Sequence, residues 1–116
     1  MGLSTHVLDT ARGQPAAGMR VTLERVAPEG TQRLGVYTLN AAGRNDAPLL
    51  APDDFTAGTY RLGFAVADYF RAQGVALPEP PFLDVVWLDF GVAAPEQHYH
   101  VPLLVSPWSY STYRGS

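Results

Sequence analysis

Residues 98–116 read HYHVPLLVSPWSYSTYRGS, and the first part of this stretch, HYHVPLLV at 98–105, decides how the chain folds. It is rich in β-branched, aromatic and leucine residues, which favours a strand. Successive side chains of a strand point to opposite faces. One face is uniformly apolar or aromatic and suits a core: Tyr99, Val101, Leu103 and Val105. His98 and His100 then lie next to each other on the face that points away from the core.

The rest of the chain repeats this pattern in short segments. Alternating apolar and polar residues predict strands at 3–9, 19–24, 33–40 and 59–66, a buried strand at 84–90, and a last strand at 108–113 after Pro107. The remaining segments are a predicted short helix at 68–73, ended by Gly74, and loops at 10–18, 40–46, 47–58 and 77–81. Glycine (11) and proline (10) are abundant, which favours short strands joined by tight turns. Together these features predict an all-β sandwich with one short helix.

The composition limits the classes of function that the chain can serve. Its 116 residues suffice for one domain, 1–116, with a core of its own. The absence of cysteine excludes disulfides, a thiol nucleophile and zinc sites built on thiolates. A net charge of −3 argues against nucleic acid or an anionic membrane surface as a partner. Only 16% of the residues are charged and 47% are hydrophobic, so we expect other subunits to cover part of the surface.

No targeting signal is visible in the sequence. Residues 1–6 contain neither the basic segment nor the apolar stretch of a signal peptide. No apolar run approaches the ~18 residues that a membrane-spanning helix needs. We therefore expect a soluble, cytoplasmic protein.

Three histidines and one arginine are the candidate reactive residues. His6 lies in the first predicted strand on the face opposite the core, as His98 and His100 do in theirs. Arg44 lies in the polar loop 40–46, and loops held by a rigid sheet often carry functional side chains. On spacing alone, a solvated outer face would also tolerate the histidines, and a solvated charge is the simpler interpretation of Arg44.

Four segments carry a resemblance to a known family. LSTHVLD at 3–9, Gly43-Arg44 in the middle loop, HYHVPLL at 98–104 and YRGS at 113–116 resemble the signatures of the 5-hydroxyisourate hydrolases, the transthyretin-like enzymes of urate breakdown. The resemblance covers the whole chain, with no departure at any motif position. The combination of His-Tyr-His with a C-terminal Tyr-Arg-Gly-Ser is the feature that separates these enzymes from transthyretin, the hormone carrier.

The resemblance implies a fold, an assembly and a reaction. The fold would be a prealbumin (transthyretin)-like sandwich of two four-stranded sheets. The assembly would be a homotetramer, a dimer of dimers, with active sites in a channel where the dimers meet. The reaction would be the hydrolysis of 5-hydroxyisourate to 2-oxo-4-hydroxy-4-carboxy-5-ureidoimidazoline by opening the six-membered ring, with no cofactor. Carried over by motif, the catalytic residues would be His6, Arg44, His100 and Ser116, and His98, Tyr113 and Arg114 would help to bind substrate or position the tail.

The chemistry of these residue types fits such a reaction. Hydrolysis of an amide by water needs a base that works near neutral pH, and histidine supplies one. Either His100 or His6 can be that base on this reasoning. Arg44 offers a planar fork of donors that stays charged and can hold carbonyl oxygens and a developing oxyanion. Ser116, through its hydroxyl or its carboxylate, would orient an imidazole or the water.

Two other functions use the same residues. Three converging histidines could bind zinc with an open position for water, although Arg44 beside a divalent cation would be electrostatically unfavourable. A transthyretin-like tetramer could instead carry a small aromatic ligand such as a thyroid hormone in its channel. That channel would need apolar walls where this chain has histidine, arginine and the polar tail, so a polar channel argues for hydrolysis.

Overall fold

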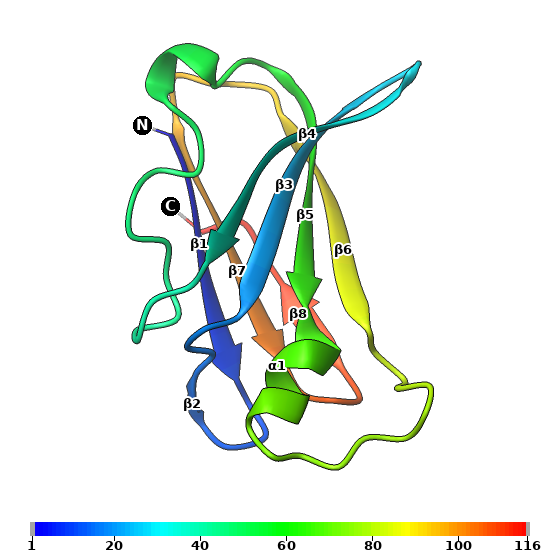
Figure 1. Ribbon diagram of the computed structural model, residues 1–116. Coiled ribbons are helices and arrows are strands. Elements are labelled where there is room, and N and C mark those ends of the chain that lie inside the picture. Colours follow the sequence, from blue (N-terminus) through cyan, green and yellow to red (C-terminus); the bar gives the residue numbers. More distant parts are fainter. Residues whose placement is uncertain (1, 116) are drawn as a thin grey trace.

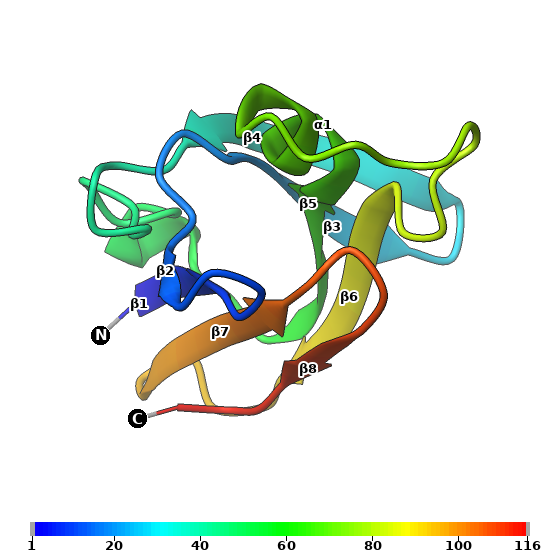
Figure 2. The same cartoon turned by 90° about the horizontal axis from the view of Figure 1, so that it is seen from below.

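The computed structural model describes residues 2–115, which form two four-stranded sheets that face each other across a hydrophobic core (Figures 1 and 2). One sheet has the strand order β2-β1-β7-β8 and the other β4-β3-β5-β6. The strands are β1 (Gly2–Asp9), β2 (Gln14–Pro15), β3 (Arg20–Ala27), β4 (Gly30–Thr38), β5 (Gly58–Ala65), β6 (Val85–Val92), β7 (His98–Val105) and β8 (Tyr110–Thr112). The helix α1 spans Val66–Ala72, and a 3₁₀ turn spans Pro52–Asp54. The predicted sandwich of two four-stranded sheets with one short helix is confirmed.

The core lies between the inward faces of the two sheets, as alternation predicted. In β7 the predicted apolar face is buried, with Leu103 and Val105 fully inaccessible to solvent. In β5 the inward side chains Tyr60, Leu62 and Phe64 are also fully buried. Burying a large apolar side chain stabilises a fold by about 1.5–3 kcal/mol. This shared core fixes which face of each strand points outward.

The parallel pairing of β1 with β7 brings distant segments together. In its register Ser4 lies opposite His100, and His6 lies opposite Pro102. Both strands bury their other face in the core, so a shift of one residue would turn either set of side chains around. The outward side chains of the two strands therefore form one continuous surface.

Two expectations from the sequence need correction. The segment 10–18 was expected to be loop throughout, but β2 pairs with the end of β1, with Pro15 opposite Leu8. The segment 84–90 was expected to be a buried strand, but Val85 is 40% and Trp87 48% exposed. The reason is that β6 is the last strand of its sheet and buries one face only.

The helix α1 is joined to β1 through a buried carboxylate. Asp9 is fully buried at the end of β1 and accepts hydrogen bonds from the Tyr69 hydroxyl (2.9 Å) and from Arg12 Nε (3.1 Å). A buried charge is tolerated when it is paired and hydrogen-bonded in this way. Within residues 2–115, no helix has the length and apolar character needed to cross a membrane.

Candidate functional site

The outer face of the β1–β7 pair carries the polar side chains that the sequence singled out. His6 is half-buried on β1, and His98 and His100 lie on the outward face of β7. Neighbouring strands are spaced ~4.8 Å apart and two residues along a strand span ~6.6 Å, so the Cα atoms of His6 and His100, diagonal neighbours, are about 8 Å apart. The two residues are therefore near neighbours on one face of the sheet.

A serine of β1 joins the two histidines of β7. The hydroxyl oxygen of Ser4 lies 2.9 Å from Nε2 of His98 and 2.8 Å from Nδ1 of His100. Both distances are those of good hydrogen bonds. The backbone register explains the contact, because Ser4 lies opposite His100 and both side chains point outward. Ser4 belongs to the first motif of the sequence but was not among the residues predicted for the site.

The loop after β4 places Arg44 beside His6. The backbones of these two residues form an isolated antiparallel bridge, and the amide of Val7 donates to the carbonyl of Gly43 (2.9 Å). Asn40 closes the loop from within, since its Oδ1 accepts from the amide of Arg44 (3.1 Å). The guanidinium of Arg44 is thus carried by a loop whose backbone is fixed to β1, with its side chain exposed to solvent.

Gly43 is required for this close approach. Its φ of +73° lies in the left-handed region, which favours glycine. A Cβ at this position would lie 2.6 Å from the carbonyl oxygen of Val7. In the Gly43-Arg44 pair of the sequence motif, Gly43 therefore allows the loop to approach β1, and Arg44 carries the guanidinium.

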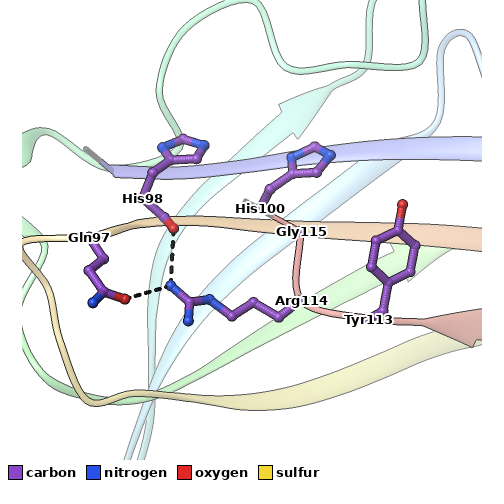
Figure 3. Close-up of a pocket in the computed structure, with 6 residues that line it drawn as sticks. All are labelled: Gln97, His98, His100, Tyr113, Arg114 and Gly115. Atoms are coloured by element: carbon purple, nitrogen blue, oxygen red, sulfur yellow. Dashed lines mark hydrogen bonds between the residues drawn. The ribbon is translucent and has the colours of Figure 1, made fainter.

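The C-terminal segment returns to the other side of His100. The amide of Gly115 donates to the carbonyl of His100 (2.7 Å), which seats the tail against β7. Arg114 Nη2 donates to Gln97 Oε1 (2.9 Å) and to the His98 carbonyl (3.3 Å) (Figure 3). Its guanidinium also lies over the ring of Tyr99, 4.1 Å from the ring centroid. Arg114 therefore anchors the tail. Ser116, the expected fourth catalytic residue, lies outside the described residues.

An open pocket of about 740 Å³ lies against these residues. It is lined by Gln97, His98, His100, Tyr113, Arg114 and Gly115. Figure 3 shows the imidazoles of His98 and His100 pointing to the same side of β7, with Tyr113 beside them. His6 and Arg44 are not part of this lining; they lie next to it on the same outer face.

The surroundings of two histidines favour their neutral forms. Burial lowers the pKa of His6, and the nearby Arg44 lowers it further, against a hydrogen bond to the backbone of Ala42. Burial also lowers the pKa of His100, with further contributions from the charges of Arg44, His6 and His98. Imidazoles with a pKa below 6.5 are neutral at pH 7 and can accept a proton from water.

The arrangement brings proton acceptors and a cation to one outer face of the sheet. Neutral imidazoles can act as proton acceptors, and a guanidinium can hold carbonyl oxygens or a developing negative charge. Gln97 adds an amide at the edge of the pocket that the sequence analysis also missed. Its position directly before the HYH segment is the one signal in the sequence that points to Gln97.

A family model described as the HIUase/Transthyretin family matches residues 3–115. Among curated proteins, the 5-hydroxyisourate hydrolase of Ralstonia nicotianae is 57% identical over 114 residues, covering 98% of this chain and 97% of that protein. The 5-hydroxyisourate hydrolase of Deinococcus radiodurans is 56% identical over 115 residues, covering 99% of this chain and 96% of that protein.

Solved structures show the same fold. A crystal structure of (S)-allantoin synthase matches with a TM-score of 0.93 and 47% identity; the match covers 99% of this chain but 43% of that one. The structure of Klebsiella pneumoniae 5-hydroxyisourate hydrolase matches over 100% of both chains, with a TM-score of 0.81 and 34% identity. Sea bream transthyretin in complex with thyroxine matches with a TM-score of 0.87 and 30% identity, covering 99% of this chain and 95% of that one.

Proposed function

The chain belongs to the HIUase/Transthyretin family, and on that premise we propose that it is a hydrolase that opens the six-membered ring of 5-hydroxyisourate. The predicted transthyretin-like fold is confirmed, but that fold is common to relatives named for hydrolysis and to a protein with bound thyroxine. The choice between these functions rests on the site. The observation that carries the proposal is the polar outer face on which His6, Arg44 and His100 lie together.

Histidine is the proposed base. His100 or His6 takes a proton from a water molecule as the water oxygen attacks the carbonyl carbon of a ring amide. The carbon–nitrogen bond of that amide then breaks, the carbon keeps the oxygen as a carboxylate, and the leaving nitrogen takes up a proton. The lowered pKa values of both histidines support this role, because each is ready to accept a proton at neutral pH. General base catalysis of this kind contributes about 10²- to 10⁴-fold.

Arginine is the proposed electrophilic group. Its five N–H donors form a planar fork that matches adjacent oxygens of a planar heterocycle. As the attacked carbonyl becomes tetrahedral, Arg44 would hold the negative charge on its oxygen. One well-aimed donor contributes about 3–4 kcal/mol to such a transition state. The backbone bridge to His6 supports this role, because it fixes the loop that carries the guanidinium.

The tail completes the proposed site. Arg114 would hold the C-terminal segment in place, and Tyr113 would form part of the wall around the substrate. The role of Ser116 as an orienting group stays a prediction from the motif. The single-domain organisation and the cytoplasmic location also stay predictions.

We also propose the homotetramer implied by the family. The strands β6 and β8 each form an edge of their sheet, and an unpaired edge is a template for pairing with another chain. An apolar groove of about 310 Å³ lies between them and is lined in part by Trp87 and Tyr113. A molar mass of four chains by size-exclusion chromatography with light scattering is the expected result. A monomer at micromolar concentration would contradict the assembly.

A carrier function and a zinc-dependent reaction are the competing proposals. A hormone carrier would place apolar walls where this chain has His6, Arg44 and His100. Zinc binding would have to compete with an existing contact, because Nε2 of His98 and Nδ1 of His100 both lie within hydrogen-bonding distance of the Ser4 hydroxyl. Hydrolysis without a metal stays a prediction, and activity that survives thorough chelation would support it.

The test is the decay of freshly generated 5-hydroxyisourate, followed by ultraviolet absorbance with and without the protein. His6→Ala, Arg44→Ala and His100→Ala should each lower turnover by orders of magnitude while the circular dichroism spectrum stays native. Arg33→Ala, an exposed arginine on β4 in the other sheet, is the matched control and should keep full activity. Folded site variants with full activity would remove the site assignment.

A further inference from the structure

We propose that Ser4 is a positioning residue that fixes the tautomer of His100 and joins it to His98 through one shared hydroxyl. The two contacts, 2.8 Å to Nδ1 of His100 and 2.9 Å to Nε2 of His98, converge on the same oxygen. For the reaction this inference rests on the proposed hydrolase function. The hydrogen-bond geometry itself does not depend on which reaction the site performs.

The hydroxyl has one proton, which couples the two rings. Ser4 can donate to one imidazole nitrogen only, so it must accept from the other. When both rings are neutral, two arrangements satisfy both contacts. In the first, Nδ1–H of His100 donates to Ser4, which donates to Nε2 of His98, so both rings are Nδ1–H tautomers. In the second, both directions are reversed and both rings are Nε2–H tautomers.

The first arrangement is the one that a base at His100 requires. His100 borders the pocket, and its Nδ1 is used by Ser4, so Nε2 is the nitrogen left to meet a water molecule. With Nδ1 protonated, Nε2 carries the lone pair that accepts the proton. A base at His100 therefore requires the Nδ1–H tautomer of that ring and, through the shared Ser4 hydroxyl, the same tautomer of His98.

The same contacts give the accepted proton a route to solvent. When Nε2 of His100 takes a proton from water, the Nδ1 proton can pass to the Ser4 oxygen while the Ser4 hydroxyl proton passes to Nε2 of His98. Two N–H or O–H bonds break and two form, so the serine is unchanged. The positive charge ends on His98, which is exposed to solvent, whereas His100 is half-buried.

The ring of His100 is held on a second side by the tail. A Cβ at Gly115 would lie 2.8 Å from Cδ2 of His100, so the backbone of the tail packs closely against the imidazole. Ser4 meets the ring at Nδ1, on the side of β1. Between the two contacts the ring has little freedom to rotate, which is the preorganisation that an oriented base needs.

Nitrogen-15 NMR of the histidine rings tests the coupling without any substrate. At about pH 8, where imidazoles are neutral, His98 and His100 should both be Nδ1–H tautomers. In Ser4→Ala each ring should lose this preference and show a mixture of tautomers, and Ser4→Thr should restore it because threonine keeps the hydroxyl. Three results would each overturn the assignment. In the unchanged protein, these are different tautomers at the two rings, or Nε2–H tautomers at both. In Ser4→Ala, it is a tautomer preference that stays as in the unchanged protein.

Kinetics test the consequence for the reaction. Ser4→Ala should lower kcat by about 10- to 100-fold with little change in KM, because an imprecisely oriented base acts poorly on bound substrate. Ser4→Thr should recover most of this loss. Ser109→Ala, in the exposed turn between β7 and β8, is the matched control and should behave like the unchanged protein. Wild-type-like turnover in Ser4→Ala would overturn the positioning role.

The two measurements separate this proposal from the proposed function. If the unchanged protein does not accelerate the decay of 5-hydroxyisourate, the hydrolase proposal fails while matched tautomers at His98 and His100 still establish the coupling. If the protein is an active hydrolase and the tautomers do not respond to Ser4, the positioning role fails alone.

Discussion

Arg44 pairs with His6 through an antiparallel backbone bridge, so the backbone that carries a guanidinium in the middle of the chain is fixed beside the first-strand residue that carries an imidazole. The pairing affects the histidines through the charge of Arg44 as well as through its position. The positive charge of Arg44 lowers the pKa of His6 and of His100, in each case after the larger effect of burial.

Removing the charge of Arg44 should therefore raise the pKa of both histidines. In Arg44→Gln the imidazolium forms no longer face a cation, so each pKa should move toward 6.5 without reaching it, because burial remains. NMR titration of the ring protons measures the change and needs no activity. Arg44→Lys keeps the charge and should keep both values low. Unchanged titrations in Arg44→Gln would show that the guanidinium lies too far from the two rings to act on them.

The lowered pKa values also set the acidic limit of activity. The proposed base must be neutral, so kcat/KM should be constant near pH 7 and fall as the pH drops through the folded-state pKa of His6 or His100, below 6.5. Stability should follow the same direction, because between the folded pKa and 6.5 the unfolded chain binds more protons. Thus unfolding should become easier as the pH falls below 6.5. A pH–rate profile with its acidic midpoint above 6.5 would contradict both histidines as the base.

Gly43→Ala should detach the loop that carries Arg44. The new Cβ would meet the carbonyl oxygen of Val7 at 2.6 Å, and alanine at a φ of +73° adds backbone strain of about 1 kcal/mol or more. The loop must move away from β1, so activity should fall by at least about 10-fold. Thermal unfolding and the absorbance assay measure the two effects. Ala42→Gly, next to it in the same loop, is the control for loop flexibility; a Gly43→Ala variant as active as that control would show that the close approach is unimportant.

Asp9→Ala should lower stability without removing the site. Asp9 ends the first motif but points into the core, where it accepts from Tyr69 and from the Arg12 side chain. Its loss leaves the buried Tyr69 hydroxyl without its acceptor, at a cost of about 1–3 kcal/mol in the free energy of unfolding. Tyr69→Phe should cost less, since only one hydrogen bond is lost. Urea titration measures both, and kcat below the transition should stay within about twofold; a large loss of kcat in folded Asp9→Ala would place Asp9 in the catalytic machinery.

The faces of the strands could be predicted from the sequence, but their partners could not. Alternation in β7 placed His98 and His100 outward because Leu103 and Val105 leave no doubt about the core side. Ser4 contacts both histidines because of the register between β1 and β7. It lies 94 residues before His98 and 96 before His100, and no local pattern determines such a distant pairing. Serine is also common on the outer faces of strands, so its residue type did not mark Ser4 as part of a site.

The position of a strand at the edge of its sheet was a second feature that could not be predicted from the sequence. The apolar run that contains Val85 and Trp87 looks like a strand buried on both faces, and only the sheet order shows that it lies at an edge. Arg44 shows the opposite case. Its loop context alone favoured a solvated charge, and the motif resemblance placed it in the site; the structure brings it beside His6.

Arg114→Ala should release the tail from β7 while the fold remains intact. The guanidinium donates to Gln97 and to the His98 carbonyl, and it stacks on the ring of Tyr99, so alanine removes all three contacts. An exposed cation–π contact contributes only about 0.5–1 kcal/mol, so the unfolding temperature should change little. The tail would then be held against His100 only by the backbone bond of Gly115, so its position should be less well fixed and kcat/KM should fall by about 10- to 100-fold. Gln97→Ala removes one of these contacts and should give a smaller loss, whereas equal activity in Arg114→Ala and the unchanged protein would mean that the tail is seated by its backbone bond to His100 alone.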